Sequence, residues 1–428
     1  MSTVIDEMES PYGTLDRLLR RQLLARLRGL RSGRLLWRDA LGVAEFGEAA
    51  HGDDPVVEIE VQDPAFYRAL AANGSVGAGG AYIDGLWRCT APGADAGRAL
   101  VALGRLMLRN RELLDGFESG LARIGGAALR AWNGTRRNSR DGSRRNIAAH
   151  YDLGNDFFAT FLSADRMYSS ALWDGPDDNL ETASTRKLDA VCRKLALRPD
   201  DHVVEIGTGW GGFALHAARH YGCRVTTTTI SREQHAVALE RVTAAGLGSR
   251  IDVRLDDYRD LTGEYDKLVS IEMIEAVGAE FLGTYFGMID RLLKPGGLAL
   301  LQAITIEDHR YELALRSVDY IKRYVFPGSF IPSVNAILAA KTEASSLRLQ
   351  SLEDFAESYA RTLEAWRDRF NAHRAEVRAL GKDERFIRMW EFYLAYCEAG
   401  FRERSIGVAH LLFEKPRIDG TRGEGASR

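Results

Sequence analysis

The feature that most constrains the fold of this chain is a short apolar strand that runs directly into a group of glycines. Residues 203–206 read Val-Val-Glu-Ile, glycines follow at 207, 209, 211 and 212, and a helical pattern begins at Phe213. Glycine lets the backbone turn sharply and approach a ligand without a Cβ clash. Dinucleotide-binding enzymes use Gly-x-Gly-x-x-Gly at such a turn, but here a glycine already stands at 211. The pattern predicts a strand, a ligand-binding turn and a helix; a tight turn without a ligand is the less favoured alternative.

Strand-like and helical segments alternate over much of the chain. Strands separated by helical runs predict a parallel sheet with right-handed crossovers. Long helical stretches at 332–347 and 351–405 are expected to cover a ligand pocket beside that sheet. Nearer the N-terminus, 56–61 alternates like a half-buried strand, and helical patterns cover 64–72 and 96–124. The strands expected in the parallel sheet are 203–206, 224–229, 251–255, 268–271 and 298–304.

Length and composition fit a soluble protein of two domains. The chain has 428 residues, of which 45% are hydrophobic and 27% charged. The Arg- and Ser-rich stretch 133–145 has the composition of a linker. It is expected to separate an accessory domain, 1–132, from a larger domain, 146–414, which a disordered tail, 415–428, follows. No apolar run approaches the roughly 18 residues of a membrane span, and a signal-peptide pattern is absent, so a cytoplasmic protein is expected.

The cysteines argue against metal or disulfide chemistry. They never form a Cys-x-x-Cys pair, so neither a metal site nor a disulfide framework is expected. The four cysteines are Cys89, Cys192, Cys223 and Cys397.

Positive charge is concentrated in two places although the net charge is −3. Residues 15–31 carry six arginines, with leucines at helical spacing, which is typical of a helix that lies on an anionic membrane. The alternative is that the leucine face packs on the domain core and the arginines are solvated. A second cluster comprises Arg136, Arg137, Arg140, Arg144 and Arg145. Two clusters favour contacts with anionic lipid head groups over nucleic acid, because the overall balance is acidic and no nucleic-acid-binding module is present.

The glycine turn resembles motif I of class I S-adenosylmethionine (SAM) methyltransferases, Glu-x-Gly-x-Gly-x-Gly, which holds the amino-acid end of SAM. Glu205, Gly207, Gly209 and Gly211 match it. The resemblance implies an α/β fold of this Rossmann-like class, with a parallel-type sheet and a helical lid, preceded by a smaller α+β N-terminal domain. Further residues that the resemblance places at SAM are Tyr168, Ser169, Thr229, Ser231, Gln234, Asp257 and Tyr258.

Other motifs resemble the cyclopropane-fatty-acyl-phospholipid synthase family over about 145–412. This family moves the SAM methyl group onto the cis double bond of an acyl chain in a membrane phospholipid. A weaker match at 81–87 resembles the small N-terminal domain of full-length bacterial members. The matching motifs are His150–Phe158, Met167–Trp173, Val203–Gly212, Thr229–Gln234, Asp257–Asp260, Lys294–Gly297, Tyr324–Gly328 and Tyr393–Arg402.

The chemistry that the resemblance implies places demands on the site. An alkene is a weak nucleophile, so it must be held against the sulfonium methyl in a dry slot. Methylation leaves a carbocation that aromatic faces can stabilise, and a base must then remove a proton. Each aromatic residue taken alone is more commonly core packing than a cation-stabilising group. The candidates are Tyr151, Phe157, Phe158, Tyr168, Trp173, Tyr320, Tyr324 and Phe326.

The base in this family is thought to be a bound bicarbonate, and the chain departs from the family pattern there. Ala276 and Gln302 replace two imidazoles, and Ser170 replaces a cysteine. Cys397 matches a cysteine once considered the family nucleophile, but the chemistry needs no covalent enzyme intermediate, so buried packing is favoured. The residues that match the bicarbonate site are Ser170, Glu275, Gln302, Ile304 and Tyr359.

Glu272 stands three residues before Glu275, at a position where many family members have glycine. If a helix starts here, the two carboxylates share a face at the carboxyl end of strand 268–271, where open α/β sheets place their ligands. Adjacent carboxylates raise one pKa, which suits a general base near neutral pH. The hypothesis is that Glu272 replaces or supplements bicarbonate; the equally weighted alternative is a carboxylate favoured at a helix N-terminus.

The sequence thus predicts a SAM-dependent enzyme on the inner face of the cytoplasmic membrane. Its partners would be anionic membranes and phospholipids with unsaturated acyl chains, and a homodimer is compatible with the resemblance. Its product would be a cyclopropane or a mid-chain methyl or methylene branch. The second product is what the resemblance implies, because Glu-Met-Ile-Glu-Ala-Val-Gly with Gln-Ala-Ile-Thr resembles the branch of the family that makes such fatty acids. The alternatives are a methyltransferase of a soluble small molecule and a lipid-binding protein without catalysis.

Overall fold

The chain forms two compact units, each built from segments that are far apart in the sequence. The computed structural model describes residues 12–115, 142 and 153–417. Unit 1 comprises Met1–Thr135, Arg316–Pro327 and Leu363–Ser405, and unit 2 comprises Arg136–Leu315, Gly328–Thr362 and Ile406–Arg428. The boundaries expected at 132, 145 and 414 stay a prediction, because most of the linker and most of the tail lie outside the described residues.

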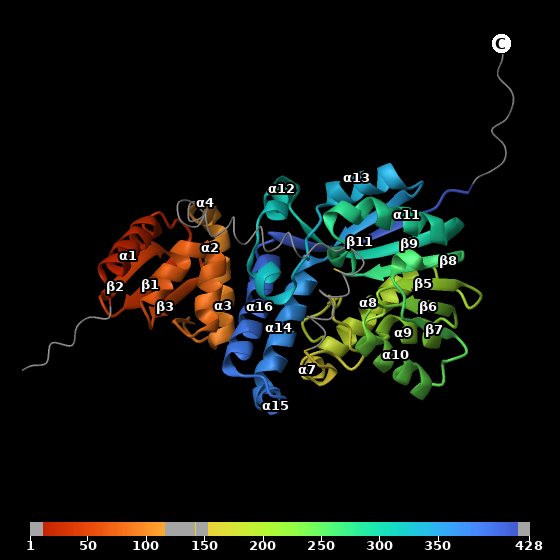
Figure 1. The fold of residues 1–428 in the computed structure, drawn as a ribbon, viewed down its shortest axis with the longest axis horizontal. Coiled ribbons are helices and arrows are strands. Elements are labelled where there is room, and N and C mark those ends of the chain that lie inside the picture. The colour runs from red at the N-terminus through yellow and green to blue at the C-terminus, as the bar shows by residue number, and fades with distance from the viewer. Residues whose placement is uncertain (1–11, 116–141, 143–152, 418–428) are drawn as a thin grey trace, which may run out of the picture. The chain divides into compact units, whose positions relative to one another are not determined.

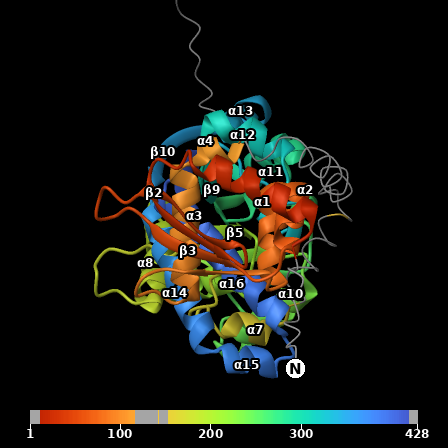
Figure 2. The same ribbon diagram turned by 90° about the vertical axis from the view of Figure 1, so that its left-hand side faces the viewer.

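Unit 1 contains a four-stranded sheet in the order β2-β1-β3-β4. β1 pairs with β2 antiparallel and with β3 parallel, and β4 is antiparallel to β3. Figure 2 shows this sheet together with the N-terminal helices. The N-terminal elements are α1 (Thr14–Leu27), β1 (Gly33–Asp39), β2 (Gly42–Glu48), β3 (Val56–Val61), α2 (Ala65–Ile83), β4 (Trp87–Thr90), α3 (Ala96–Arg109) and α4 (Arg111–Asp115). The later elements are the π-helix η4 (Ile321–Val325), the second part of α14 (Ala356–Ala372), α15 (Arg374–Ala379) and α16 (Glu384–Arg402).

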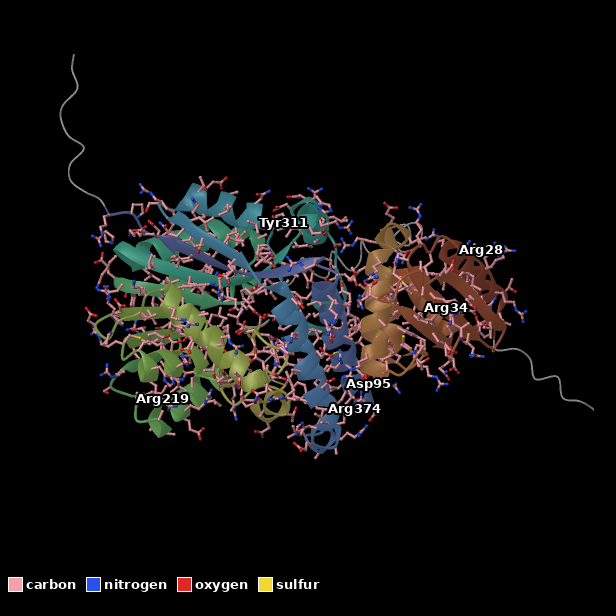
Figure 3. All side chains as sticks on the ribbon, turned by 180° about the vertical axis from the view of Figure 1, so that it is seen from behind. Arg28, Arg34, Asp95, Arg219, Tyr311 and Arg374 are labelled. Atoms are coloured by element: carbon pink, nitrogen blue, oxygen red, sulfur yellow. The ribbon has the colours of Figure 1, made fainter. Side chains whose placement is uncertain are left out.

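The basic N-terminal helix packs part of its leucine face into the core of unit 1. Leu23 and Leu27 of α1 are buried with the sheet residues Leu35 and Trp37. The alternative in which the leucine face packs on the domain core is therefore correct for the C-terminal half of the helix. At its start Leu15 is 53% exposed, and the arginine that follows the helix, Arg28, is exposed as well (Figure 3).

Unit 2 contains a seven-stranded sheet in the order β10-β11-β9-β8-β5-β6-β7 (Figure 1). The five strands from β9 to β7 are parallel, and β11 runs antiparallel to both of its neighbours. The strands are β5 (His202–Ile206), β6 (Arg224–Thr228), β7 (Ile251–Arg254), β8 (Tyr265–Ile271), β9 (Leu293–Ile306), β10 (Arg348–Asp354) and β11 (Ile406–Glu414). The helices are α7 (Asn155–Ala159), α8 (Leu180–Lys194), α9 (Gly212–His220), α10 (Arg232–Ala244), α11 (Leu282–Leu292), α12 (Asp308–Arg316), α13 (Val334–Ala344), the first part of α14, and the 3-10 helices η1 (Tyr258–Asp260), η2 (Ile274–Ala276) and η3 (Ala279–Phe281).

Helices cover both faces of this sheet. Successive strand residues point to opposite sides, so a central strand contributes side chains to two cores. Val204 of β5 is buried in a core that includes α11 and α13. Its neighbour Val203 is buried in a second core, which includes α8, α9 and one residue of α10. The central strand β5 is therefore covered on both faces, as its apolar run requires, whereas β7 at the edge has only one buried residue.

The structure corrects the expectation of one long helical stretch over 351–405. Residues 348–354 form strand β10, and the segment that follows β10 is divided among α14, α15 and α16. Strand β11 was not anticipated, although its run Ile-Gly-Val-Ala-His-Leu-Leu-Phe is mostly apolar. All five expected parallel strands are present within a few residues at their ends, as is the strand 56–61. The helix expected over 96–124 is broken at Asn110 within its described part.

None of the described helices is long and apolar enough to cross a bilayer. The basic cluster at 136–145 and Tyr151 lie outside the described residues.

Candidate active site

The glycine turn after β5 has the backbone geometry that the sequence predicts. Gly207, Gly209 and Gly211 have φ angles of +101°, +52° and +84°, a region that side chains disfavour. A Cβ built on Gly209 would meet no protein atom within 4 Å, so open space lies beside this part of the turn. Gly212 is required for packing instead, because its Cβ would lie 2.5 Å from Met167 Sδ. The turn can therefore admit a ligand at Gly209 without a change in the protein.

Five other residues assigned to SAM follow the carboxyl ends of the neighbouring parallel strands β6 and β7: Thr229, Ser231, Gln234, Asp257 and Tyr258. After β6, Thr229 donates a hydrogen bond to Gln234 Oε1 at 2.9 Å, and Ser231 caps α10 by accepting one from Gln234 N. After β7, Asp257 is buried and forms an ion pair with Arg259 at 2.7 Å. These side chains hold one another, as preorganised binding residues do.

Sequence reasoning missed one buried cation beside the turn, Lys187 of α8. Its ammonium donates to Ser169 Oγ at 2.9 Å, and the residue is fully buried. Burial lowers the pKa of Lys187 to about 8, and the charges of Glu272, Asp165 and Glu205 oppose that shift. Burial likewise raises the pKa of Glu205 to about 8, although Thr227 donates to its carboxylate at 2.6 Å. The signal in the sequence was a lysine on the apolar face of α8, between Ala183 and Val191.

Glu272 lies at the carboxyl end of β8 in a strained backbone conformation, with φ of +48°. Such a conformation costs a non-glycine residue about 1 kcal/mol or more and is found mainly at functional sites. Its Oε1 accepts from Ser170 N at 2.8 Å and from Gln302 Nε2 at 2.7 Å. Its Oε2 accepts from the Tyr359 hydroxyl at 2.6 Å. The carboxylate is thus held from three segments of the chain, by contacts other than those of a helix-capping residue.

Burial raises the pKa of Glu272, while the donors Tyr359, Ser170 and Gln302 and the charge of Lys187 act in the opposite direction. The pKa of this buried carboxyl group is therefore higher than that of an exposed glutamate. A higher pKa makes the carboxylate a better proton acceptor near neutral pH.

Glu275, on the 3-10 helix η2, is the second carboxyl group of the site. Its Oε1 accepts from Ile304 N at 2.6 Å, and its Oε2 is buried with no hydrogen-bond partner among the described residues. Burial and then the charge of Glu272 raise the pKa of Glu275 to about 8. At neutral pH Glu275 is therefore mainly the uncharged acid.

The donors expected to hold a bicarbonate are all engaged by these two carboxyl groups. Ser170 N, Gln302 Nε2 and the Tyr359 hydroxyl donate to Glu272, and Ile304 N donates to Glu275. The carboxylate of Glu272 therefore occupies the place that a bicarbonate would need, and the residues present do not fit that ion.

The raised pKa of Glu275 predicts a pH dependence of stability. Between its ordinary value of 4.5 and about 8, the folded state holds a proton that the unfolded state has lost. Stability due to this group is therefore complete below pH 4.5 and is lost as the pH rises towards 8. Relative to Glu275→Gln, wild type should lose at least about 2–4 °C more in melting temperature between pH 5 and 8, the shift that 1 kcal/mol produces in a domain of this size. Exposed Glu357→Gln is the control; parallel pH curves for wild type and Glu275→Gln would contradict the assignment.

A second residue that sequence reasoning missed is His410 of β11. It is 2% exposed, and its Nε2 lies 3.0 Å from Gln302 Oε1. Its Nδ1 lies 2.9 Å from the ammonium of Lys194 at the end of α8. The only sequence signal was a histidine within an apolar run, and the strand that carries it was not expected.

Cys397 belongs to unit 1, whereas Glu272 and Glu275 belong to unit 2. Burial raises the pKa of the Cys397 thiol, which makes it a poor nucleophile. Tyr320, Tyr324 and Phe326 also belong to unit 1. In unit 2, Arg361 already lies over the Trp173 ring at 4.4 Å. Phe157, Phe158 and Tyr168 pack with Phe161 and Trp210.

Comparison with known proteins identifies the family. Residues 138–411 match the model of the mycolic acid cyclopropane synthetase family. The chain belongs to this family. A relative from Mycobacterium tuberculosis, tuberculostearic acid methyltransferase UfaA1, is 43% identical over 277 residues, which are 63% of this chain and 65% of the relative. The cyclopropane-fatty-acyl-phospholipid synthase of Escherichia coli is 37% identical over 88% of this chain and 92% of its own length.

Solved structures agree with this assignment. The cyclopropane synthase MmaA2 from Mycobacterium tuberculosis has a TM-score of 0.60 at 27% identity and covers 64% of this chain and 98% of its own. The mycolic acid cyclopropane synthase CmaA1, complexed with SAH and CTAB, has a TM-score of 0.59 at 28% identity, with the same coverage. Family membership confirms the expected family, the α/β methyltransferase fold, the enzyme class and SAM as the family's cofactor.

Proposed function

We propose that this chain transfers a methyl group from SAM to the cis double bond of an unsaturated acyl chain in a membrane phospholipid. The observation that carries the proposal is the carboxylate of Glu272, held by Ser170, Gln302 and Tyr359 beside the glycine turn. An alkene methyltransferase needs such a base, because the carbocation that methylation forms must lose a carbon-bound proton to give a stable product. When bound, SAM supplies an electrophilic methyl group.

The protein's own part is to hold the cofactor and to take up a proton. Gly207, Gly209 and Gly211 would accommodate the amino-acid end of SAM, with Gln234 and Asp257 beside it. Glu272 Oε2 accepts a single hydrogen bond among the described contacts, from Tyr359, and keeps a lone pair. We propose that this oxygen receives the proton that the methylated acyl chain loses, in the place of bicarbonate.

Loss of one proton can give two products with the same mass, because a cyclopropane and a methylene branch each add one CH₂ to the chain. We propose the mid-chain methylene branch. Its support is the sequence similarity to UfaA1, named as a tuberculostearic acid methyltransferase, at 43% identity. The second candidate is a cyclopropane, supported by the 37% identity to the Escherichia coli synthase over most of the chain.

Incubation of the purified protein with SAM and vesicles of a monounsaturated anionic phospholipid, in carbonate-free buffer, tests the proposal. Lipids that gain one CH₂ are expected by mass spectrometry. Ozonolysis then separates the products, because it cleaves a methylene branch to a ketone and leaves a cyclopropane intact. Absence of any lipid product, with SAM still bound, would favour a soluble small-molecule substrate; failure to bind SAM would favour a non-catalytic lipid-binding protein.

We also propose that the enzyme works while bound peripherally to the inner face of the cytoplasmic membrane. The basic segment 136–145 is the main contact, since each arginine near an anionic surface contributes about 1 kcal/mol. Replacing its five arginines with serine should weaken binding to anionic vesicles in a flotation assay, and added salt should weaken wild-type binding in the same way.

A control variant changes the net charge equally through exposed arginines of unit 2, one of which is labelled in Figure 3. Its binding should stay close to wild type. Equal binding of wild type to neutral and anionic vesicles would refute the electrostatic contact. The control positions are Arg193, Arg198, Arg219, Arg232 and Arg348.

A further inference from the structure

A row of polar side chains crosses the sheet of unit 2 behind the carboxylate of Glu272. Strand register places Glu353 of β10 opposite His410 of β11, and His410 opposite Gln302 of β9. Gln302 is in turn opposite Ile271, the last residue of β8, and its carbonyl accepts from Glu272 N at 2.8 Å. Directly opposed residues project to the same face of a sheet, so this row runs from the exposed edge strand to the site.

The hydrogen bonds along the row have one direction. The ammonium of Lys194 can only donate, so His410 Nδ1 must accept, and the proton of the neutral ring is on Nε2. That Nε2–H donates to Gln302 Oε1 at 3.0 Å. The Gln302 NH₂ group then has both protons directed at the site, to Glu272 Oε1 at 2.7 Å and to the Ser170 carbonyl at 3.2 Å.

The opposite direction of the Gln302 amide would be unfavourable at both ends. Its oxygen would face the Glu272 carboxylate and the Ser170 carbonyl, and its NH₂ would face the N–H of His410. Inside a protein such unpaired polar contacts cost free energy comparable to a lost hydrogen bond each. Burial and the nearby charges of Lys194 and Lys187 lower the pKa of His410 well below its ordinary value, which keeps the ring neutral and the direction fixed.

We propose that His410 is a positioning residue which, with Lys194 behind it, fixes the Gln302 amide so that its NH₂ group faces the Glu272 carboxylate. His410 does not touch the reacting groups and acts through Gln302 alone. The inference deepens the proposed function and rests on it, because it assumes that Glu272 accepts the proton.

The charged and titratable groups around Glu272 define what a pH profile will report. Lys187 faces it from α8, Glu275 from η2 and Tyr359 from α14. Around His410 lie Lys194 and Lys187 of α8 and the ring of Phe355 at 4.7 Å. None of the other titratable groups is altered in a His410 variant. A change in the acid limb of its pH profile therefore reports a change in the orientation of the Gln302 amide towards Glu272.

His410→Phe tests the proposal in the full-length protein on monounsaturated phospholipid vesicles. Without the N–H donor, the Gln302 amide can turn its oxygen to Glu272, which favours the protonated carboxyl. We expect kcat to fall about tenfold, the equivalent of one lost charge-assisted hydrogen bond, while SAM affinity is kept. The acid limb of the kcat profile should move to higher pH, and His410→Gln, which retains an N–H donor, should recover most of the turnover.

One further variant keeps the test decisive if His410→Phe does not fold, and two others serve as controls. Lys194→Met removes the donor that fixes the ring and should shift the acid limb in the same direction. Glu353→Gln removes only the partner of Lys194 at the exposed edge, where Glu353 is 57% exposed, and should change little. His202→Phe, a histidine at the start of β5 whose ring contacts Tyr265, is the matched control for aromatic substitution.

The outcomes separate this inference from the proposed function. An unshifted acid limb in both His410→Phe and Lys194→Met, with Glu272→Gln inactive, overturns the positioning role and leaves the base in place. Near-normal turnover by Glu272→Gln overturns the proposed base and the inference with it.

Discussion

Replacing Glu272 with glutamine is expected to lower turnover of a monounsaturated phospholipid by about 10²-fold or more, the loss typical of a removed general base. Glutamine has the same shape and can still accept from Ser170 N and Gln302 through its oxygen. It cannot take up a proton. SAM affinity, measured by calorimetry, should stay close to wild type, because the glycine turn is untouched. Turnover near the wild-type level would return Glu272 to a structural role.

The same base should be visible in the pH profile of the wild type. Glu272 must be ionised to act, so kcat rises with pH as its carboxyl loses the proton. Because burial raises the pKa of Glu272, this rise should occur above the pH range in which an exposed glutamate titrates. The Glu272→Gln variant should lack this limb, and exposed Glu357→Gln should keep it.

Replacing Glu272 with glycine should convert the site into one that depends on bicarbonate. Glycine relieves the strain of the +48° φ angle and frees Ser170 N, Gln302 Nε2 and the Tyr359 hydroxyl. In carbonate-free buffer this variant is expected to be as slow as Glu272→Gln, and added bicarbonate should restore activity to it alone. A wild type that requires added bicarbonate would contradict the proposed replacement.

Gly209→Val is expected to abolish detectable SAM binding. A branched side chain would fill the open space beside the turn and would force valine into a positive φ of +52°, which β-branched residues strongly disfavour. Calorimetry with SAM measures the loss directly.

Gly246→Val provides a control with matched strain. Gly246 has φ of +67° and also has no protein atom within 4 Å of its Cβ position, but it follows α10 on the exposed surface. It should lose a similar amount of stability and keep SAM affinity. Equal SAM binding by Gly209→Val and wild type would show that the cofactor does not pass this glycine.

The parallel part of the fold was predictable because its signals are local. Each of the five strands is a short segment, rich in apolar or β-branched residues, between helical patterns, and the glycines after 206 mark the turn by their lack of side chains. The strands at the other edge were not predictable in this way. β10 is exposed along its whole length, so its residues show no alternation of buried and exposed positions. The helical pattern that precedes β11 has no clear end in the sequence, so the start of this strand was not recognisable. Their pairing with β9 and with each other is decided by long-range contacts.

The active site likewise has a part that the sequence predicts and a part that long-range contacts decide. The sequence alone made Glu275, Gln302, Ile304 and Tyr359 candidates through its resemblance to the family, and Glu272 through its place after a strand end. It left two roles open for Glu272, since a carboxylate near a helix start can cap that helix or serve chemistry. Only the tertiary structure brings the hydroxyl of Tyr359, 87 positions away, to its Oε2.

The contacts of His410 with Lys194 and with Gln302 were also decided by tertiary structure alone. Lys194 and His410 are 216 positions apart, and no local pattern couples the end of a helix to an edge region of a sheet. Strand register aligns His410 with Gln302, and the chemistry of an ammonium, which only donates, then sets the direction of every hydrogen bond that follows. The sequence provides the side chains of Lys194, His410 and Gln302. Their burial in one row across the sheet fixes the direction of the hydrogen bonds between them, because other directions would leave buried polar groups unpaired, which costs free energy.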